Sequence, residues 1–225
     1  MVESKKQSNP NPGVISFPPY NCDMPELSEL SNKVLFLWLK KWALAGGPKI
    51  QKSYALGSSF MRVLNQTINQ YTAARKELLF HVEHPDRLVH YFNAITYLES
   101  CIIFLRRSLR FAEAIKRDYF SPKIGGKRSV FSSGVIKKIT DLRNGIEHLD
   151  EKLIKVNNCV MSINEKDFDL MEIKVTYDEL ATWIKQLYEI AEQFLQEDTS
   201  VQFISRKGRL TYKVGGKNER FLGTL

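Results

Sequence analysis

One long helical repeat of apolar residues, from Asp86 to about Tyr119, most constrains what this chain can fold into. Its apolar side chains recur at three- and four-residue steps: Leu88, Tyr91, Phe92, Ile95, Leu98, Ile102, Leu105, Leu109 and Ala112. This spacing places them on one stripe of an α-helix. Because such a stripe must be buried, the rest of the chain has to supply partners for a long helix.

Similar repeats predict those partners as further helices. Two precede the long helix and two follow it, at residues 26–44, 53–82, 130–156 and 177–196. Either Thr176 or Asp178 is expected to cap the last of them. Short connections between the first helices favour antiparallel neighbours.

Two short β-rich runs between the last two helices depart from the helical repeat. The runs CVMSI and LMEIKV lie within residues 159–175, separated by NEKDFD, and predict a small β-hairpin. Two short strands cannot form a core alone. The predicted fold class is therefore all-α: an antiparallel helical bundle of about five helices, with a short β-hairpin insertion before the last helix.

The two ends of the chain lack the long helical repeat. Residues 1–25 contain five of the eight prolines and are expected to form an extended or disordered N-terminal arm. Residues 26–198 are expected to form the bundle. Residues 199–225 are expected to form either a basic C-terminal tail or a second hairpin around Lys207 and Gly208.

Composition excludes several classes of protein. With 225 residues, 43% of them hydrophobic and 26% charged, the chain has the composition of a globular protein. Its three cysteines include no C-x-x-C spacing, which excludes zinc-ribbon and dithiol redox motifs. Free thiols, the absence of an apolar signal core and the shortness of every purely apolar run predict a cytoplasmic protein without a membrane partner.

The net charge of +8 is concentrated in two segments. Residues 101–140 carry ten Lys or Arg against two acidic residues, and residues 199–225 carry six against one. Both segments predict a polyanionic partner. The candidate phosphate-binding residues of the first segment are Arg106, Arg107, Arg110, Lys127, Arg128 and Lys137.

The densest group of functional side chains lies in the predicted fourth helix. Arg143, Asn144, Glu147 and His148 fall within two helical turns. In a helix, Asn144 and His148 share one face, while Arg143 and Glu147 share a neighbouring face and are close enough to pair. Gly145 lowers helix stability by about 1 kcal/mol relative to alanine, which suggests a close approach by another backbone or by a ligand.

The run Arg143-Asn144-Gly145-Ile146-Glu147-His148 resembles the catalytic motif of the HEPN superfamily (higher eukaryotes and prokaryotes nucleotide-binding). That motif is an Arg, commonly followed by a polar residue, with a His four to six residues later. It lies late in a helical bundle, and the long helix before it here is similar to the helix that packs against the motif in this family. The resemblance spans residues 26–198, and its specific part is this short run.

The resemblance implies a metal-independent endoribonuclease that acts on RNA as a homodimer, with no cofactor and no metal. His148 would act as general acid or base on the ribose 2′-hydroxyl or the leaving oxygen, because imidazole titrates near neutrality. Arg143 would bind the scissile phosphate and stabilise the transition state. Asn144 would orient His148 or a phosphate oxygen. A role in defence or stress response, with a possible antitoxin or regulatory protein as partner, also follows from the resemblance.

Further residues acquire expected roles from this resemblance. Glu99 either orients Arg143 or lies on the polar side of the long helix, and Glu147 is a possible supporting residue beside Arg143. Toxin members of the family often carry a Tyr two residues after the His, where this chain has Asp150. The basic residues of the first segment become expected RNA contacts.

Two other functions remain open at the level of sequence. The bundle is also compatible with a module that binds nucleotide, RNA or protein without catalysis, and with an adaptor in which the Arg and His spacing is accidental. His81, His84 and His90 superficially resemble a metal-ligand set. Their position at a helix end beside Pro85 favours loop and cap residues instead, and no metal site is expected.

Overall fold

The computed structural model describes residues 21–43, 48–119, 129–148, 161–170, 173–198, 202–206, 209–214 and 217–220. Its helices are α1 (Ser28–Ala43), α2 (Pro48–Glu83), α3 (Leu88–Tyr119), α4 (Ser133–Glu147) and α6 (Tyr177–Asp198). Its strands are β1 (Met161–Ile163), β2 (Asp167–Leu170), β3 (Ile173–Thr176), β4 (Gln202–Arg206), β5 (Arg209–Val214) and β6 (Lys217–Arg220). The predicted all-α class, with a β insertion before the last helix, is confirmed.

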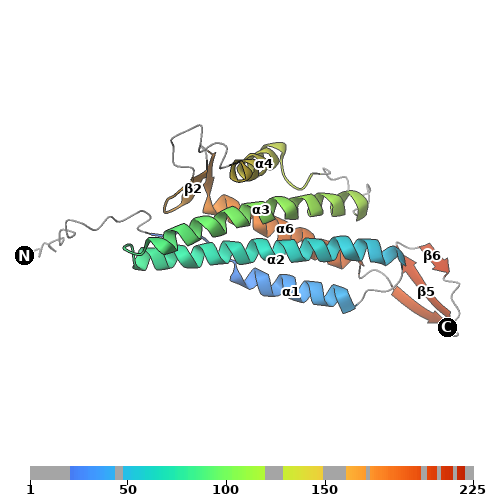
Figure 1. Cartoon of the computed structure of the whole chain (residues 1–225). Coiled ribbons are helices and arrows are strands. Elements are labelled where there is room, and N and C mark those ends of the chain that lie inside the picture. The colour runs from blue at the N-terminus through green and yellow to red at the C-terminus, as the bar shows by residue number, and fades with distance from the viewer. Residues whose placement is uncertain are drawn as a thin grey trace, which may run out of the picture.

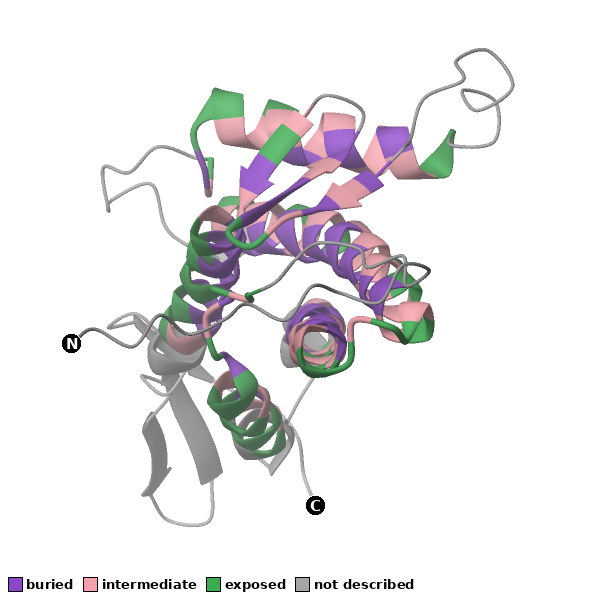
Figure 2. Cartoon of the chain, turned by 90° about the vertical axis from the view of Figure 1, so that its left-hand side faces the viewer, coloured by how far each residue is buried: buried purple, intermediate pink, exposed green. Residues whose placement is uncertain are grey.

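The helices α1, α2, α3 and α6 form the bundle (Figure 1). α2 and α3 make a long antiparallel hairpin, and α1 and α6 pack beside them. After α3, the chain runs back through α4 and the sheet β1–β3 to the end of the bundle at which α3 begins. α6 starts at this end and therefore runs parallel to α3 and antiparallel to α2. α4 and this sheet form a layer on the side of the bundle away from α1 (Figures 1 and 2).

The core lies where the stripes of α2, α3 and α6 meet (Figure 2). On α3 most of the predicted stripe is buried, including Leu98, Ile102, Leu105 and Leu109. Phe92 departs from the prediction, because its side chain is 56% exposed. Adjacent helical residues differ by about 100° around the axis, and at this turn Tyr91 takes the buried position, its hydroxyl accepting a hydrogen bond from the Ile163 N–H at 3.4 Å.

Two helix boundaries differ from those expected. α2 begins at Pro48 rather than at residue 53, because proline at the first helical position lacks only an N–H that a helix start leaves unpaired. α4 begins at Ser133, after the N-cap Ser132, and ends at Glu147 rather than near residue 156. His148 is therefore the C-cap and does not lie inside the helix. Residues 149–160 lie outside the described part of the chain.

The insertion between α4 and α6 contains three strands rather than the expected two. β1 pairs with β2 and β2 with β3, both antiparallel. The inward residues Phe168 and Val175 are register partners and are fully buried. The sheet thus adds its own apolar side chains to the core of the bundle.

The segment 21–27 precedes α1 without helix or strand and packs on the bundle. The Asp23 N–H donates to the Glu165 carbonyl at 3.0 Å, and Met24 is buried. Arg75 on α2 donates to the Met24 carbonyl through Nε and pairs with Glu26 at 2.7 Å. The remainder of the predicted N-terminal arm, residues 1–20, lies outside the described residues.

α3 contains a stretch, Leu88–Arg117, that is long and apolar enough to cross a membrane by length and composition. In this structure the same helix packs against α2, α4 and α6. An apolar core helix and a membrane span pass the same test of composition, so the expected cytoplasmic location stays a prediction.

Candidate functional site at the end of helix α4

α4 is held against the bundle by one buried face. Ile139, Leu142 and Gly145 are its buried residues, at steps of three that place them on one side of the helix. Gly145 therefore lies on the packing side of α4, and the close approach expected from its position in the sequence stays a prediction. This face fixes how the polar residues of α4 are presented around the rest of the helix.

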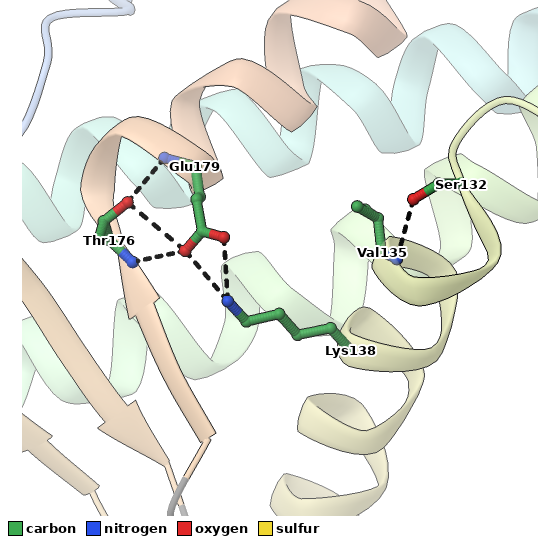
Figure 3. A network of polar contacts seen from close by, with 5 residues as sticks. All are labelled: Ser132, Val135, Lys138, Thr176 and Glu179. Carbon is green, nitrogen blue, oxygen red and sulfur yellow. Dashed lines mark hydrogen bonds and ion pairs between the residues drawn. The ribbon is translucent and has the colours of Figure 1, made fainter.

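A polar anchor joins α4 to the start of α6 (Figure 3). Lys138 Nζ donates to both carboxylate oxygens of Glu179 at 3.0 Å. The same ammonium lies 5.8 Å from the centre of the Trp183 ring. The anchor fixes α4 relative to α6 through one ion pair and one cation–π contact.

Glu179 also caps its own helix. Its backbone N–H donates to Thr176 Oγ1 at 3.1 Å, and the Thr176 N–H donates to Glu179 Oε2 at 3.0 Å, which is a capping box. Thr176, rather than Asp178, is thus the cap of α6. Burial favours the protonated carboxyl, but these hydrogen bonds and Lys138 outweigh it and hold the pKa of Glu179 below its ordinary value.

Arg143 points along the last turns of α4 and is partly buried. Its Nη1 donates to Asn144 Oδ1 at 3.1 Å, and its Nη2 forms an ion pair with Glu147. The Arg143 and Glu147 side chains are each 33% exposed. The expected pairing of Arg143 with Glu147 is present, and the Asn144 amide oxygen is oriented towards Arg143.

His148 lies where α4 ends. Its backbone N–H donates to the carbonyls of Asn144, at 3.1 Å, and Ile146, which closes the last turn of the helix. The residue is exposed to solvent. Arg143 and His148 thus belong to the same end of α4, one partly buried beside the helix and the other exposed at its tip.

Arg106 of α3 lies within electrostatic range of Arg143. Burial, with repulsion from Arg110 and Arg143, lowers the pKa of Arg106, and the nearby Glu113 offsets this only in part. The Arg106 Nη1 atom is buried and makes no hydrogen bond within the described part of the chain. Arg106 therefore lies within electrostatic range of Arg143, which has a smaller effect on its pKa than Arg110 or Glu113.

The other expected basic contacts are spread over different surfaces. Arg110 is exposed one turn beyond Arg106, on the same side of α3. Arg107 is exposed and lies 5.7 Å from the Phe104 ring centre. Lys137 pairs with Asp141 at 2.7 Å on the solvent side of α4. Lys127 and Arg128 lie outside the described residues.

Glu99 lies on α3 seven residues before Arg106, and hence on the same side of that helix. It is partly buried, and burial raises the pKa of its carboxyl. Among the described residues the structure shows no hydrogen bond or ion pair between Glu99 and Arg143. Glu147, rather than Glu99, is the carboxylate that orients Arg143 here.

Sequence reasoning missed two relationships that define this site. The capping box at 176–179 has a readable signature, a Thr followed three residues later by a Glu. The position of Arg106 near Arg143 has no such sequence signature, because it depends on how α4 packs on α3. No group of three or more His, Cys, Asp or Glu side chains that could hold a metal ion occurs among the described residues.

No protein-family model, curated protein or solved structure matches this chain.

Proposed function

We propose that this protein is a metal-independent endoribonuclease of HEPN type, in which Arg143 and His148 cleave RNA at the exposed end of α4. The observation that supports this most is the partly buried guanidinium of Arg106, which lies within electrostatic range of Arg143. Their like charges repel, and the Arg106 Nη1 atom is buried without a hydrogen-bond partner among the described residues. A bound phosphate would offset both costs, since guanidinium groups bind phosphate oxygens through charge-assisted hydrogen bonds.

Arg143 retains donors for such a phosphate. A guanidinium carries five N–H donors, and Asn144 and Glu147 each engage one of its nitrogens. Arg143 would bind the scissile phosphate and stabilise the negative charge that develops in the transition state. Arg106 would bind the same or the adjacent phosphate from α3.

His148, at the same end of α4, would transfer the protons. It would accept the proton of the ribose 2′-hydroxyl as that oxygen attacks the adjacent phosphorus, or donate a proton to the 5′-oxygen as its bond to phosphorus breaks. The products are a 2′,3′-cyclic phosphate and a 5′-hydroxyl. His148 is exposed as a residue at the C-cap of α4.

The test is cleavage of a labelled RNA of mixed sequence by the full chain in the presence of EDTA. We expect cleavage by the wild type, products ending in a 2′,3′-cyclic phosphate, and loss of cleavage in His148→Ala with the fold unchanged by circular dichroism. His84→Ala is the matched control, because His84 is an exposed histidine in the turn between α2 and α3. Wild type without nuclease activity, or activity that survives in His148→Ala, would contradict the proposal.

A second candidate function is RNA or nucleotide binding without catalysis. The Arg143–Glu147 ion pair favours it, because a carboxylate already occupies part of the guanidinium. The phosphate site formed by Arg106 and Arg143 would then bind without turnover. In the same experiment, RNA affinity that weakens with salt but produces no cleaved product identifies this alternative.

We also propose that two copies associate, as the HEPN resemblance implies. α1 exposes Leu35, Phe36 and Leu39, at 46%, 66% and 51%. This surface lies across the bundle from α4, so association through α1 would not bring two motifs together (Figure 1). A dimer that brings two motifs together has to form around the end of α4. The test is sedimentation of the wild type and of Phe36→Ser. Because Phe36 lies on α1, the substitution should leave such a dimer intact.

A further inference from the structure

α3 carries a second stripe of residues on the side away from its buried stripe. The members recur at alternating steps of three and four along the helix, which places them on one side of it. We call this the outer face of α3, and its residues are Val89, Phe92, Thr96, Glu99 and Ile103. Val89 and Phe92 are 57% and 56% exposed. Thr96 is also exposed, whereas Glu99 and Ile103 are partly buried.

α3 contains more apolar surface than the bundle buries. The stretch Leu88–Arg117 is apolar enough to cross a membrane, yet 33% of its most apolar part is buried in the bundle. Val89 and Phe92 are among the large apolar residues that the described part of the chain leaves exposed. Apolar surface that a fold leaves uncovered in this way is typical of an interaction site.

The spacing of the outer face indicates a helix as its occupant. Alternating steps of three and four are the heptad pattern through which one helix packs against another. The next two positions of the same pattern are Arg106 and Arg110, so the apolar part of the outer face ends before them. The outer face is therefore about four helical turns long, which is enough for a helix to lie along it.

Glu99 indicates the charge of this occupant. It lies between Thr96 and Ile103 on the outer face, and no hydrogen bond or ion pair engages its carboxylate within the described part of the chain. Burial raises the pKa of this carboxyl, and a cation placed beside it would stabilise its charge. A lipid surface fits poorly, because a carboxylate inside an apolar face is costly to bury among acyl chains.

We propose that the outer face of α3 binds an amphipathic helix of another protein, with the apolar side chains of that helix over the outer face and a Lys or Arg opposite Glu99. The inference does not depend on the proposed function, because the outer face contains no residue to which that function assigns a role. It adds a protein partner of stated chemistry at a surface away from the end of α4.

The experiment selects binders of the full chain from a displayed library of helical peptides. The library has apolar residues fixed at heptad spacing and random residues elsewhere. The affinity of the selected peptides is then measured for the wild type, Phe92→Ser and Glu99→Gln. The matched controls are Phe36→Ser, which removes a phenylalanine that is 66% exposed on α1, and Glu189→Gln, which removes an exposed carboxylate on α6. Circular dichroism checks that each variant is folded.

The selected peptides should be enriched in Lys and Arg. They should bind Phe92→Ser roughly tenfold or more weakly, as truncation of a central interface aromatic does. They should bind Glu99→Gln up to about fivefold more weakly, and both controls with wild-type affinity. The inference is wrong if the library yields no binder, or if the selected peptides lack basic residues or bind Phe92→Ser as well as the wild type.

Two further outcomes would assign the outer face to a different occupant and would also overturn the inference. One is a wild-type dimer, seen by sedimentation, that Phe92→Ser dissociates, because a second copy then covers this face. The other is binding of the wild type to phospholipid vesicles that Phe92→Ser abolishes, because lipid is then the occupant.

Discussion

Arg106 on α3 and Arg143 on α4 lie close enough for the charge of Arg143 to lower the pKa of Arg106. Like charges in a folded protein are usually separated or neutralised, because their repulsion opposes folding. On the proposed function, an anion bound beside Arg106 would offset the burial of its charge and the repulsion from Arg110 and Arg143, which Glu113 offsets only in part. This relationship leads to the first prediction.

Arg106→Gln should weaken RNA binding without lowering the stability of the protein. The substitution removes a phosphate contact, which should reduce the slope of the salt dependence by about 0.7. It also removes the repulsion from Arg110 and Arg143, so the melting temperature should stay the same or rise. Fluorescence anisotropy and thermal denaturation provide the two measurements.

Arg107→Gln is the matched control for Arg106→Gln. It removes one cation from the next position on the same helix, where the side chain is exposed and lies over Phe104. An equal loss of RNA affinity in both variants would mean that only the overall charge matters and that Arg106 forms no particular site.

Glu147→Gln should increase the affinity for RNA. The Glu147 carboxylate pairs with Arg143, and both side chains are partly exposed. Partly exposed ion pairs contribute roughly 0.2–1 kcal/mol, so freeing the guanidinium should strengthen RNA binding by about 1.4-fold to fivefold. Asp141→Asn makes the same charge change beside Lys137, on the solvent side of α4. If Asp141→Asn raises the affinity as much, competition for Arg143 is not the cause.

Glu179 should make the stability of the protein depend on pH in the acid range. Its pKa is lower in the folded chain than its ordinary value, because hydrogen bonds and Lys138 outweigh the opposing effect of burial. The folded state therefore binds this proton less readily than the unfolded state does. The stabilisation is present above the ordinary pKa of about 4.3 and is lost as the pH falls through the folded value.

Glu179→Gln removes the negative charge of this side chain but retains the capping hydrogen bond. Glutamine at this position still accepts the hydrogen bond of a capping box, but it cannot pair with Lys138. Thermal denaturation between pH 3 and pH 7, chosen as roughly the range over which carboxylates titrate, should show a smaller acid loss in this variant than in the wild type. Identical pH profiles would show that Glu179 contributes no linked proton.

Gly134→Ala should stabilise the protein slightly. Gly134 lies in the first turn of α4, and a Cβ built there meets no other atom within 4 Å. Alanine lowers the backbone entropy of the unfolded chain, which is worth about 0.5 kcal/mol and about 1–2 °C in melting temperature for a chain of this size. Gly145→Ala is the contrasting variant: Gly145 is on the buried face, so a methyl group there should lower the melting temperature.

The sequence predicts the bundle well because its core helices carry long apolar stripes. Leu98, Ile102, Leu105 and Leu109 repeat at helical spacing and are buried together. The same reasoning is wrong for Phe92, because apolar character does not tell which of two adjacent residues turns inwards. Here Tyr91 does so, since the first sheet offers its hydroxyl a hydrogen-bond donor.

The residue at which α4 ends and the position of Arg106 near Arg143 could not be predicted from the sequence pattern. No glycine or proline follows Glu147 directly, so periodicity gives no reason to end the helix there. The pairing of Arg143 with Glu147 follows from their spacing and is predictable. The approach of Arg106 is a tertiary relationship, set by the packing of α4 on α3, and local spacing carries no information about it.

Glu179 both caps α6 and pairs with Lys138 of α4, and this sets the order in which these contacts can form. The α2–α3 hairpin closes through a short turn, so it can form from contacts that are local in the chain. α4 acquires its anchor only when the first turn of α6 exists, because Thr176 holds the Glu179 carboxylate in place there. A chain emerging from the ribosome would therefore pack α4 on α3 before it could form the ion pair between Lys138 and Glu179.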